Sequence, residues 1–367
     1  MLNFCTLFDS HYFIRGLIMY ESLKRQCKNF HLYIFAFDNN TYNILKELNL
    51  DSVTVISLKE FEDPELLRVK PTRTIAEYCW TATPSVIKYV FEKYKTSHCI
   101  YIDADLYFFD DPLPLIEEGG DCSVIITEHR FSSQYKSHEQ NGIYNVQFLY
   151  FKNDENGKEI VQWWRDRCIE WCYSRNEDNK FGDQKYLDDW PKRFKGVHVL
   201  QNKGGGVAPW NVQQFIYFKE NNKVMQKEIS TGDISNVIFY HFHNLIIYQE
   251  GFTKALGYPL SDGLIKYIYN EYMIKIKETI VKYSDYYSTI IKGFNKLPPD
   301  KIEISKILNR MKEGNYKGDC IIVYDEDLFQ KYLDTFGVIK YIGLIIKRVI
   351  NKVKKIIKGE NIKKATP

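Results

Sequence analysis

Residues 99–112 read CIYIDADLYFFDDP, and this stretch decides the expected fold. An apolar strand over residues 99–103 delivers two carboxylates at alternate positions, Asp103 and Asp105. In α/β sheets, ligands bind outside the carboxyl ends of the strands. Two hard oxygen ligands in such a place suit Mn²⁺ or Mg²⁺, which the phosphates of a substrate would also hold. The stretch therefore predicts a metal site at the edge of an α/β sheet.

The region before this stretch alternates strand-like and helix-like patterns, which implies βαβ units and a parallel sheet. A further helix is expected over residues 84–94, because proline is tolerated at a helix start. The expected strands are 3–7, 30–37, 53–57, 122–127, 145–151 and 235–241, and the other expected helices are 12–26, 40–48, 158–173 and 183–188. From residue 258 onward the pattern is mostly helical, with a break at Pro298 and Pro299.

An Asp-x-Asp pattern alone is weak evidence, since a chain of this length contains about one by chance. A second one, Asp325-Glu326-Asp327, follows the apolar run 320–324. We prefer Asp103 and Asp105 because they follow several βα units. The second pattern lies in the helical region, where acids often begin a helix.

Length and composition indicate a folded protein. The 367 residues suffice for one large core of roughly 250 residues plus an extension. The apolar fraction of 44%, with 28 Tyr and 23 Phe, argues against global disorder. A net charge of +3 gives no indication of nucleic-acid binding. The eight cysteines lie mostly in apolar runs and form no zinc pattern, so we expect reduced thiols in a cytosolic protein.

The basic charge is concentrated at the end of the chain. Residues 337–367 carry nine Lys or Arg and one acid, so they contribute +8 and the remainder contributes 3 − 8 = −5. Within 338–358 the apolar residues fall near one helical face, as in helices that lie on membrane surfaces. A helix docked on the body or on a partner subunit stays an alternative. We expect a catalytic domain over 1–255, a mostly helical extension over 256–336 and this tail, with the protein cytoplasmic and peripheral at the inner face of the cell membrane.

Amide and acid side chains near other strand ends are further candidates. Asn145 and Gln147 share one face of the strand 145–151, and such amides can hydrogen-bond sugar hydroxyls. Polar residues on the outer face of a half-buried strand would look the same. Asp183 and Gln184 enter a short helix, which suits either a site at a reacting sugar or a helix N-cap.

Glycines and histidines add two more candidates. The loop 204–211 reads GGGVAPWN, and Gly205 and Gly206 would let the backbone approach a ligand closely, although a plain tight loop is the alternative. His241 and His243 alternate at the end of a strand, and one of them can complete the metal shell. The residues alone leave both histidines open as the ligand.

Two charged residues complete the set. Arg73 can clamp a diphosphate with both guanidinium arms, unless it is only solvated at the surface. Glu128 follows the strand 122–127 and therefore points at the same sheet edge as Asp103. It can contact an acceptor, or act as a base if the reaction inverts.

Taken in order, these pieces resemble a glycosyltransferase of the GT-A fold. The chain is most similar to the family-8 type, which includes glycogenin and bacterial lipooligosaccharide galactosyltransferases, and it also resembles transferases of bacterial surface-polysaccharide clusters. The resemblance covers about residues 1–250. It implies a Rossmann-like nucleotide-sugar-binding domain with a mixed central sheet, followed here by a C-terminal helical extension.

The resemblance also implies roles for single residues. In that family the Asp-x-Asp binds Mn²⁺, and Asp103 and Asp105 match it. The family's late His-Phe pair supplies a metal ligand, and His241 matches its histidine. Its Asp-Gln pair lies by the reacting sugar, which implies catalytic roles for Asp183 and Gln184.

Other positions depart from the family pattern. Asn145 matches the strand residue that touches the donor sugar, but Gln147 stands where glycine is usual. Beyond the His-Phe pair the family has Gly and then Lys-Pro-Trp, whereas this chain has other residues over 244–248. Without that lysine, Arg73 or Lys203 is left to contact the diphosphate. The expected donor contacts are Phe8, Arg73, Ala104, Gly205 and Gly206.

The sequence thus predicts metal-dependent transfer of a hexose from a nucleotide diphosphate sugar, by resemblance a UDP-sugar, to a glycan or lipid-linked acceptor with retention. The expected process is surface-polysaccharide synthesis. A haloacid-dehalogenase-like phosphatase is an alternative, but enzymes of that class have Thr or Val at the position of Tyr107. A sugar nucleotidyltransferase should have a glycine-rich loop with Arg after the first strand, and residues 6–15 form no such loop. A non-catalytic, membrane-associated carbohydrate-binding protein is the remaining alternative.

Overall fold

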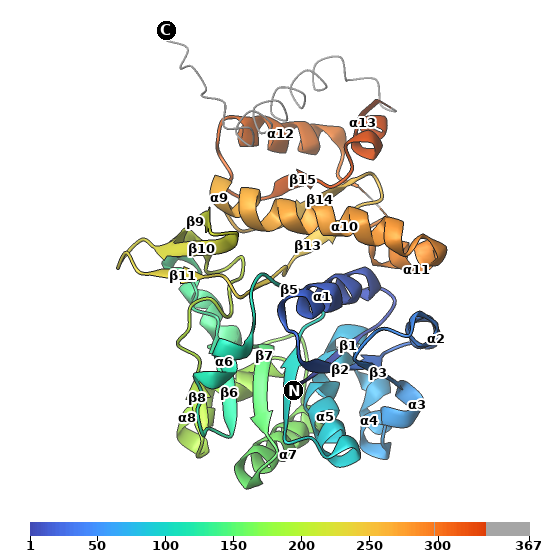
Figure 1. The fold of residues 1–367 in the computed structure, drawn as a ribbon, viewed down its shortest axis with the longest axis vertical. Coiled ribbons are helices and arrows are strands. Elements are labelled where there is room, and N and C mark those ends of the chain that lie inside the picture. The colour runs from blue at the N-terminus through green and yellow to red at the C-terminus, as the bar shows by residue number, and fades with distance from the viewer. Residues whose placement is uncertain (297, 335–367) are drawn as a thin grey trace.

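A seven-stranded mixed sheet forms the centre of the first 200 residues in a computed structural model, which describes residues 1–296 and 298–334 (Figure 1). The strand order is β3-β2-β1-β4-β7-β6-β8. Neighbouring strands from β3 to β4 are parallel, and β7 is antiparallel to both β4 and β6. The expected mixed sheet is confirmed. The strands are β1 Leu2–Phe8, β2 Phe30–Ala36, β3 Val53–Ser57, β4 His98–Ile102, β6 Val124–Glu128, β7 Tyr144–Lys152 and β8 Val197–Val199.

Helices cover both faces of this sheet because alternate residues of each strand point to opposite faces. In β1, Phe4 packs into a core with α1, while Cys5 packs into a separate core with α5 and α7. The last strand of the sheet is preceded by a compact helical turn around Trp190, which belongs to the second core. The helices up to this point are α1 Phe13–Gln26, α2 Asn39–Leu48, α3 Leu58–Phe61, α4 Pro64–Val69, η1 Lys70–Thr72, α5 Ile75–Tyr94, α6 Leu113–Glu117, η2 Ser133–Asn141, α7 Glu155–Glu170, η3 Gln184–Asp189 and α8 Trp190–Arg193.

The helix expected to begin at Pro84 begins at Ile75, and Pro84 lies inside it. Its start is a capping box, in which the Thr74 hydroxyl accepts from the Glu77 backbone N–H and the Glu77 carboxylate accepts from Thr74. Such a box satisfies two backbone donors that a helix start otherwise leaves unpaired. The capping residues therefore define this start better than the proline does.

The strand expected over 235–241 is two strands with different partners. β11 (Ile234–Asn236) pairs with β10 (Lys223–Glu228), which also pairs with β9 (Phe215–Glu220). β12 (Phe239–His241) instead pairs antiparallel with β5 (Leu106–Phe108). The short helix η4 (Val212–Gln214) leads into β9. This change of partner brings β12 to the end of β4.

The extension after residue 256 is helical, as expected, but it also contributes a strand. A small antiparallel sheet is formed by β13 (Leu245–Ile247), β14 (Phe252–Ala255) and β15 (Cys320–Val323). This sheet therefore crosses the boundary expected at residue 255. The helices are α9 Asp262–Leu264, η5 Ile265–Tyr269, α10 Asn270–Lys282, η6 Ser284–Tyr286, α11 Tyr287–Ile290, η7 Ile291–Gly293, α12 Lys301–Lys312 and α13 Glu326–Asp334.

The extension lies over α1, with α10 running beside it (Figure 1). Glu21 of α1 accepts hydrogen bonds from Lys282 and Tyr283 at 2.5 and 2.7 Å. The second Asp-x-Asp pattern begins a helix, as expected, because the Asp325 carboxylate accepts from the Asp327 and Leu328 backbone N–H groups. The tail 337–367 lies outside the described residues. None of the described helices combines the length and the apolar character needed to cross a bilayer.

Candidate metal centre

Strand pairing brings three metal-ligating side chains together. The buried strand β4 ends at Ile102, and Asp103 and Asp105 occupy the short link to β5. Because β12 pairs antiparallel with β5, His241 lies opposite Leu106. The Phe242 backbone N–H then donates to the Asp105 carbonyl oxygen at 3.0 Å. The local backbone thus carries His241 to the carboxyl end of β4.

The three side chains surround one point. His241 Nε2 lies 3.0 Å from Asp105 Oδ1 and 3.9 Å from Asp103 Oδ2, and one ligand atom from each residue falls within 4.8 Å of the others. Asp105 and His241 are only 8% and 5% exposed. Two carboxylate oxygens with an imidazole nitrogen are a ligand set that suits Mn²⁺ or Mg²⁺. It is the one such group of three found among the described residues.

Gln147 of β7 fixes the orientation of His241. Its Oε1 lies 2.8 Å from His241 Nδ1, and its backbone carbonyl accepts from the Asp103 N–H at 3.0 Å. An amide oxygen only accepts hydrogen bonds, so Nδ1 carries a proton and Nε2 is the nitrogen turned toward the aspartates. Gln147 is fully buried, and its Nε2 has no partner among the described residues. The side chain that departs from the family pattern therefore supports the metal site.

The charges of Asp103, Asp105 and His241 shift one another's pKa values. Burial raises the pKa of Asp103, and the neighbouring Asp105 adds to this shift against the opposing effect of His241. Burial also acts against the Asp105 carboxylate, but the charge and hydrogen bond of His241 outweigh it and lower the pKa of Asp105. The same carboxylates outweigh the effect of burial on His241 and raise its pKa. Tyr101 also donates to Asp103 Oδ1 at 3.0 Å. Negative charge is thus concentrated where a divalent cation fits.

Asp183 lies within electrostatic reach of this group. It is 5% exposed, and burial followed by the charge of Asp103 raises its pKa to about 8. Its side chain makes no capping hydrogen bond to η3, so the N-cap alternative does not explain it. The Gln184 side chain instead donates to the Asn141 carbonyl oxygen at 2.8 Å.

Asn145 is occupied by neighbouring groups. Its Oδ1 accepts from the Gln147 backbone N–H at 2.8 Å, and its Nδ2 lies 2.8 Å from His129 Nε2. His129 is buried against Phe131 and Trp210, and burial lowers its pKa to about 3. Asn145 therefore links β7 to the segment after β6, and its contact with a sugar stays a prediction.

The glycine loop packs behind His241. The Val207 carbonyl accepts from the His241 N–H at 2.9 Å, while the Gly205 carbonyl accepts from Arg130. Gly206 has a φ of +80°, and a Cβ there would lie 2.6 Å from Thr127 Cγ2. Packing thus explains the glycine at this position without a ligand.

The other expected donor residues are spread over the fold. The Phe8 ring is buried against Gly16, and its backbone carbonyl accepts from the Phe37 N–H at 2.9 Å. Ala104 lies buried between the two aspartates. Glu128 ends β6, which β7 separates from β4.

Two expected cations lie elsewhere, and the second histidine is not part of the cluster. Arg73 stacks 3.9 Å over the centre of the Tyr173 ring, and Lys203 pairs with Glu228. No contact joins either cation to the aspartates among the described residues. The His243 ring packs against Trp210, and the cluster contains His241 instead.

Two cavities lie near α1, and only one reaches the cluster. The cavity beside Asp105, of about 430 Å³, is lined by the segment after β1, by His243 and by a turn over residues 292–295. Sequence reasoning named His243 but missed the other walls. His11 and Tyr12, directly after a parallel strand, were a usable signal, whereas the turn gave none.

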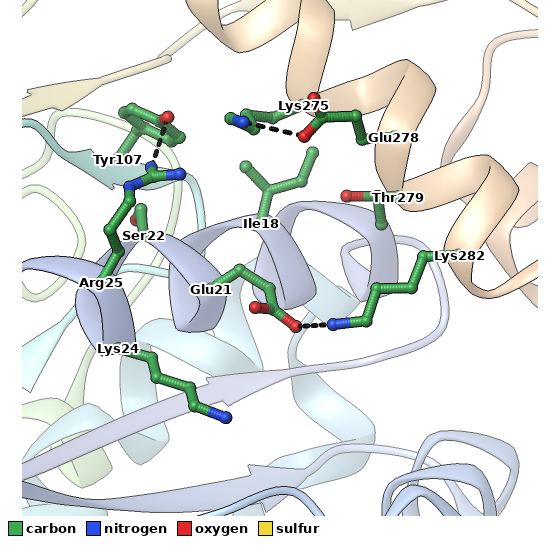
Figure 2. Close-up of a pocket in the computed structure, with 10 residues that line it drawn as sticks. All are labelled: Ile18, Glu21, Ser22, Lys24, Arg25, Tyr107, Lys275, Glu278, Thr279 and Lys282. Atoms are coloured by element: carbon green, nitrogen blue, oxygen red, sulfur yellow. Dashed lines mark hydrogen bonds and ion pairs between the residues drawn. The ribbon is translucent and has the colours of Figure 1, made fainter.

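The other cavity, of about 450 Å³, lies between α1 and α10 (Figure 2). Its charged side chains bond to one another or to nearby polar groups. Arg25 donates to the Tyr107 hydroxyl at 2.6 Å, Lys275 pairs with Glu278 at 2.8 Å, and Lys282 pairs with Glu21. Of these contacts, the Lys282–Glu21 pair joins the extension to α1.

Known proteins place the chain in a family and in a fold. No protein-family model matches it. Over 299 residues it is 34% identical to the uncharacterised protein YfnD of Bacillus subtilis, covering 80% of this chain and 94% of YfnD. Over 247 residues it is 30% identical to YfnF of the same organism, covering 65% and 80% respectively. The chain belongs to the family of these two proteins.

Among solved structures, the chain resembles the galactosyltransferase LgtC, which was solved in complex with donor and acceptor sugar analogues. The TM-score is 0.51 at 11% identity, and the match covers 78% of this chain and all of LgtC. The expected GT-A fold is thereby confirmed.

The residues after His241 and Phe242 depart from the family pattern. Asn244 adopts a φ of +57°, the left-handed backbone that glycine favours, while Ile247 is buried in β13.

Proposed function

We propose that this protein is a metal-dependent glycosyltransferase that transfers a hexose from a nucleotide diphosphate sugar, with uridine as the favoured base. The cluster of Asp103, Asp105 and His241 carries the proposal. It stands at the carboxyl end of β4 in the fold of a galactosyltransferase, where such sheets bind ligands. The adjoining cavity of about 430 Å³ offers room for part of a donor.

In the proposed site, separate residues hold the cation, orient a ligand and contact the sugar. Asp103, Asp105 and His241 would hold the cation, and Gln147 keeps Nε2 of the histidine turned toward it. A bound Mn²⁺ or Mg²⁺ supplies charge neutralisation for a leaving diphosphate. Asp183, buried near Asp103, would hydrogen-bond a hydroxyl of the transferred sugar.

In the proposed reaction, the bond between the anomeric carbon and the diphosphate oxygen breaks. A bond from that carbon to an acceptor hydroxyl oxygen forms, and the hydroxyl proton passes to the departing phosphate. The resemblance to family 8 favours attack from the face that the diphosphate leaves, with retention of configuration. The acceptor we propose is a glycan or lipid-linked glycan in surface-polysaccharide synthesis, reached at the inner face of the membrane. The basic segment 337–367 supports this location.

Release of nucleoside diphosphate from a panel of nucleotide sugars tests the proposal. We expect slow hydrolysis of one donor with Mn²⁺ and none with a chelator. Asp105→Ala should reduce the rate by roughly a hundredfold or more, because the cation loses a ligand. Asp327→Ala is the matched control, since it removes an aspartate from the second Asp-x-Asp pattern, at the start of α13. If calorimetry detects no binding of any donor, the non-catalytic alternative is favoured.

A further inference from the structure

The cavity beside Asp105 has one wall from the catalytic domain and one from the extension. Asp105 and His243 mark its metal side. The turn 292–295 lines the same cavity and contributes Lys292. A ligand that binds a cation held by Asp105 and extends into this cavity would therefore contact residues of the extension.

The turn is fixed against the start of α1. Arg15 is 9% exposed, and its guanidinium donates to the Gly293 carbonyl at 3.4 Å and to the Leu245 carbonyl at 2.8 Å. A Cβ at Gly293 would lie 2.4 Å from the His11 carbonyl oxygen, so the two backbones are in close contact. The Asn295 N–H also donates to the Ile247 carbonyl at 2.8 Å. These contacts hold the turn, and with it Lys292, at the rim of the cavity.

The cations that line the cavity differ in what they contact. The charge of Arg15 faces backbone carbonyls, and His11 bonds to Asp9. Lys292 is exposed and makes no hydrogen bond or ion pair with the residues that the structure describes. Its ammonium group is therefore available to an anion in the cavity, unlike the paired lysines of the cavity between α1 and α10.

We propose that Lys292 binds the diphosphate of the donor and stabilises it as it departs; this inference rests on the proposed function. A nucleoside diphosphate carries more negative charge than one divalent cation neutralises, so a second cation that lines the cavity stabilises it further. Arg73 and Lys203, the residues expected for this contact, are engaged with Tyr173 and Glu228 instead. The extension thereby completes a site that the catalytic domain begins.

Calorimetry of the full chain with Mn²⁺ tests the assignment, with two probes. Inorganic pyrophosphate reports on the diphosphate site without a base, and the nucleoside diphosphate that the wild-type protein binds reports on the whole pocket. Lys292→Gln should weaken both probes about tenfold, and Lys292→Arg should restore most of the affinity. The affinity for Mn²⁺ alone should stay unchanged, which a general loss of structure would not allow.

Lys296→Gln is the matched control, because it removes the same charge from an exposed lysine four residues away that does not line the cavity. It should bind both probes like the wild-type protein. Equal affinities for Lys292→Gln and wild type would overturn the role of Lys292 and leave the proposed function standing. Equal losses in both lysine variants would overturn it too, since they indicate a general charge effect. If the wild-type protein binds neither probe while Mn²⁺ binds, the proposed function fails and this inference with it.

Discussion

At the scale of single residues, Gln147 decides which nitrogen of His241 faces the aspartates. Replacing it by leucine keeps the side-chain volume and removes the acceptor at Nδ1. We expect Gln147→Leu to weaken Mn²⁺ binding about tenfold to a hundredfold, as loss of a group that orients a metal ligand usually does. Calorimetry of the metal-free protein measures this directly.

The chain offers a matched control for that substitution. Gln226 is also fully buried, but it donates to the Lys203 carbonyl in the β9–β11 sheet. Gln226→Leu should lower the free energy of unfolding without changing the Mn²⁺ affinity. Gln147→Glu should bind Mn²⁺ at least as well as the wild-type protein, because a carboxylate also accepts from Nδ1. Wild-type affinity in Gln147→Leu would contradict the orienting role.

His129 predicts a pH dependence of stability. Its ordinary pKa of about 6.5 falls to about 3 in the folded protein because of burial. Between these values the unfolded chain binds a proton that the folded chain does not, so the stability that neutral His129 maintains above pH 6.5 is lost as the pH falls. The loss is up to about 1.4 kcal/mol per pH unit below 6.5.

His129→Gln should therefore make the free energy of unfolding less dependent on pH between 7 and 5. Urea unfolding at pH 7, 6 and 5 compares the two slopes. The variant should be less stable than the wild-type protein at pH 7, where it loses the packing of the imidazole against Trp210. Parallel slopes in the two proteins would contradict a buried neutral His129.

Local sequence predicted the cluster of Asp103, Asp105 and His241 better than the positions of the two cations. Asp103 and Asp105 follow a strand of recognisable pattern, and His241 is the end of another, so sheet geometry brings them together. The partners of Arg73 and Lys203 are an aromatic ring and a carboxylate that are distant along the chain. A long charged side chain reaches several neighbours, and its own sequence context does not select among them.

At the scale of elements, the turn formed by η7 predicts the effect of one methyl group. Gly293→Ala has two opposing effects on stability. Alanine restricts the unfolded chain more than glycine does, which by itself would stabilise the folded protein by about 0.4–1 kcal/mol. The clash of its Cβ with the His11 carbonyl at 2.4 Å acts in the other direction. Overpacking of this kind typically costs about 1–3 kcal/mol, so we expect net destabilisation.

Because the clash pushes the turn away from α1, Gly293→Ala should also weaken pyrophosphate binding while Mn²⁺ binding persists. Thermal unfolding and calorimetry of the same preparation test both effects. A variant more stable than the wild-type protein, with unchanged pyrophosphate affinity, would show that the turn does not pack against His11.

Sequence patterns predicted six of the seven strands of the central sheet, and β8 was not expected. These six strands follow their apolar runs, and β3 has the expected bounds. The start of α5 followed the capping residues Thr74 and Glu77 instead of Pro84. One apolar run became β11 and β12 because its two halves pair with different strands, which hydropathy alone does not reveal.

At the scale of the whole molecule, the order of βα units was enough to predict a mixed sheet and the edge at which the candidate site lies. The contribution of the extension to the wall of the cavity could not be predicted from the order of these units. It depends on contacts between residues far apart in the chain, such as Arg15 with Leu245 and Gly293. The pairing of β14 with β15 is another such contact, and it carries the small sheet across the expected domain boundary.

The charge distribution of the whole chain makes a last prediction, which concerns the membrane. The tail contributes +8 to a chain whose remainder is −5, so attraction to anionic lipid should depend on the tail alone. Each lysine near such a surface adds about 1 kcal/mol, and replacing six should weaken binding to phosphatidylglycerol vesicles by at least roughly a hundredfold. The tail variant changes to glutamine Lys340, Lys347, Lys352, Lys354, Lys355 and Lys358.

A control variant separates the tail from total charge, because it loses the same six positive charges from exposed lysines of the body. It changes to glutamine Lys59, Lys93, Lys95, Lys158, Lys192 and Lys195. Vesicle flotation of the full-length proteins should show loss of binding only in the tail variant, and no binding of any form to neutral phosphatidylcholine. If both variants still float with anionic vesicles, the tail is not what binds the membrane. If the wild-type protein does not float, the acceptor has to reach the site of Asp105 without a membrane to present it. Nucleoside diphosphate release from a soluble glycan acceptor should then equal the release from a lipid-linked one, whereas a membrane-bound enzyme should favour the lipid-linked acceptor.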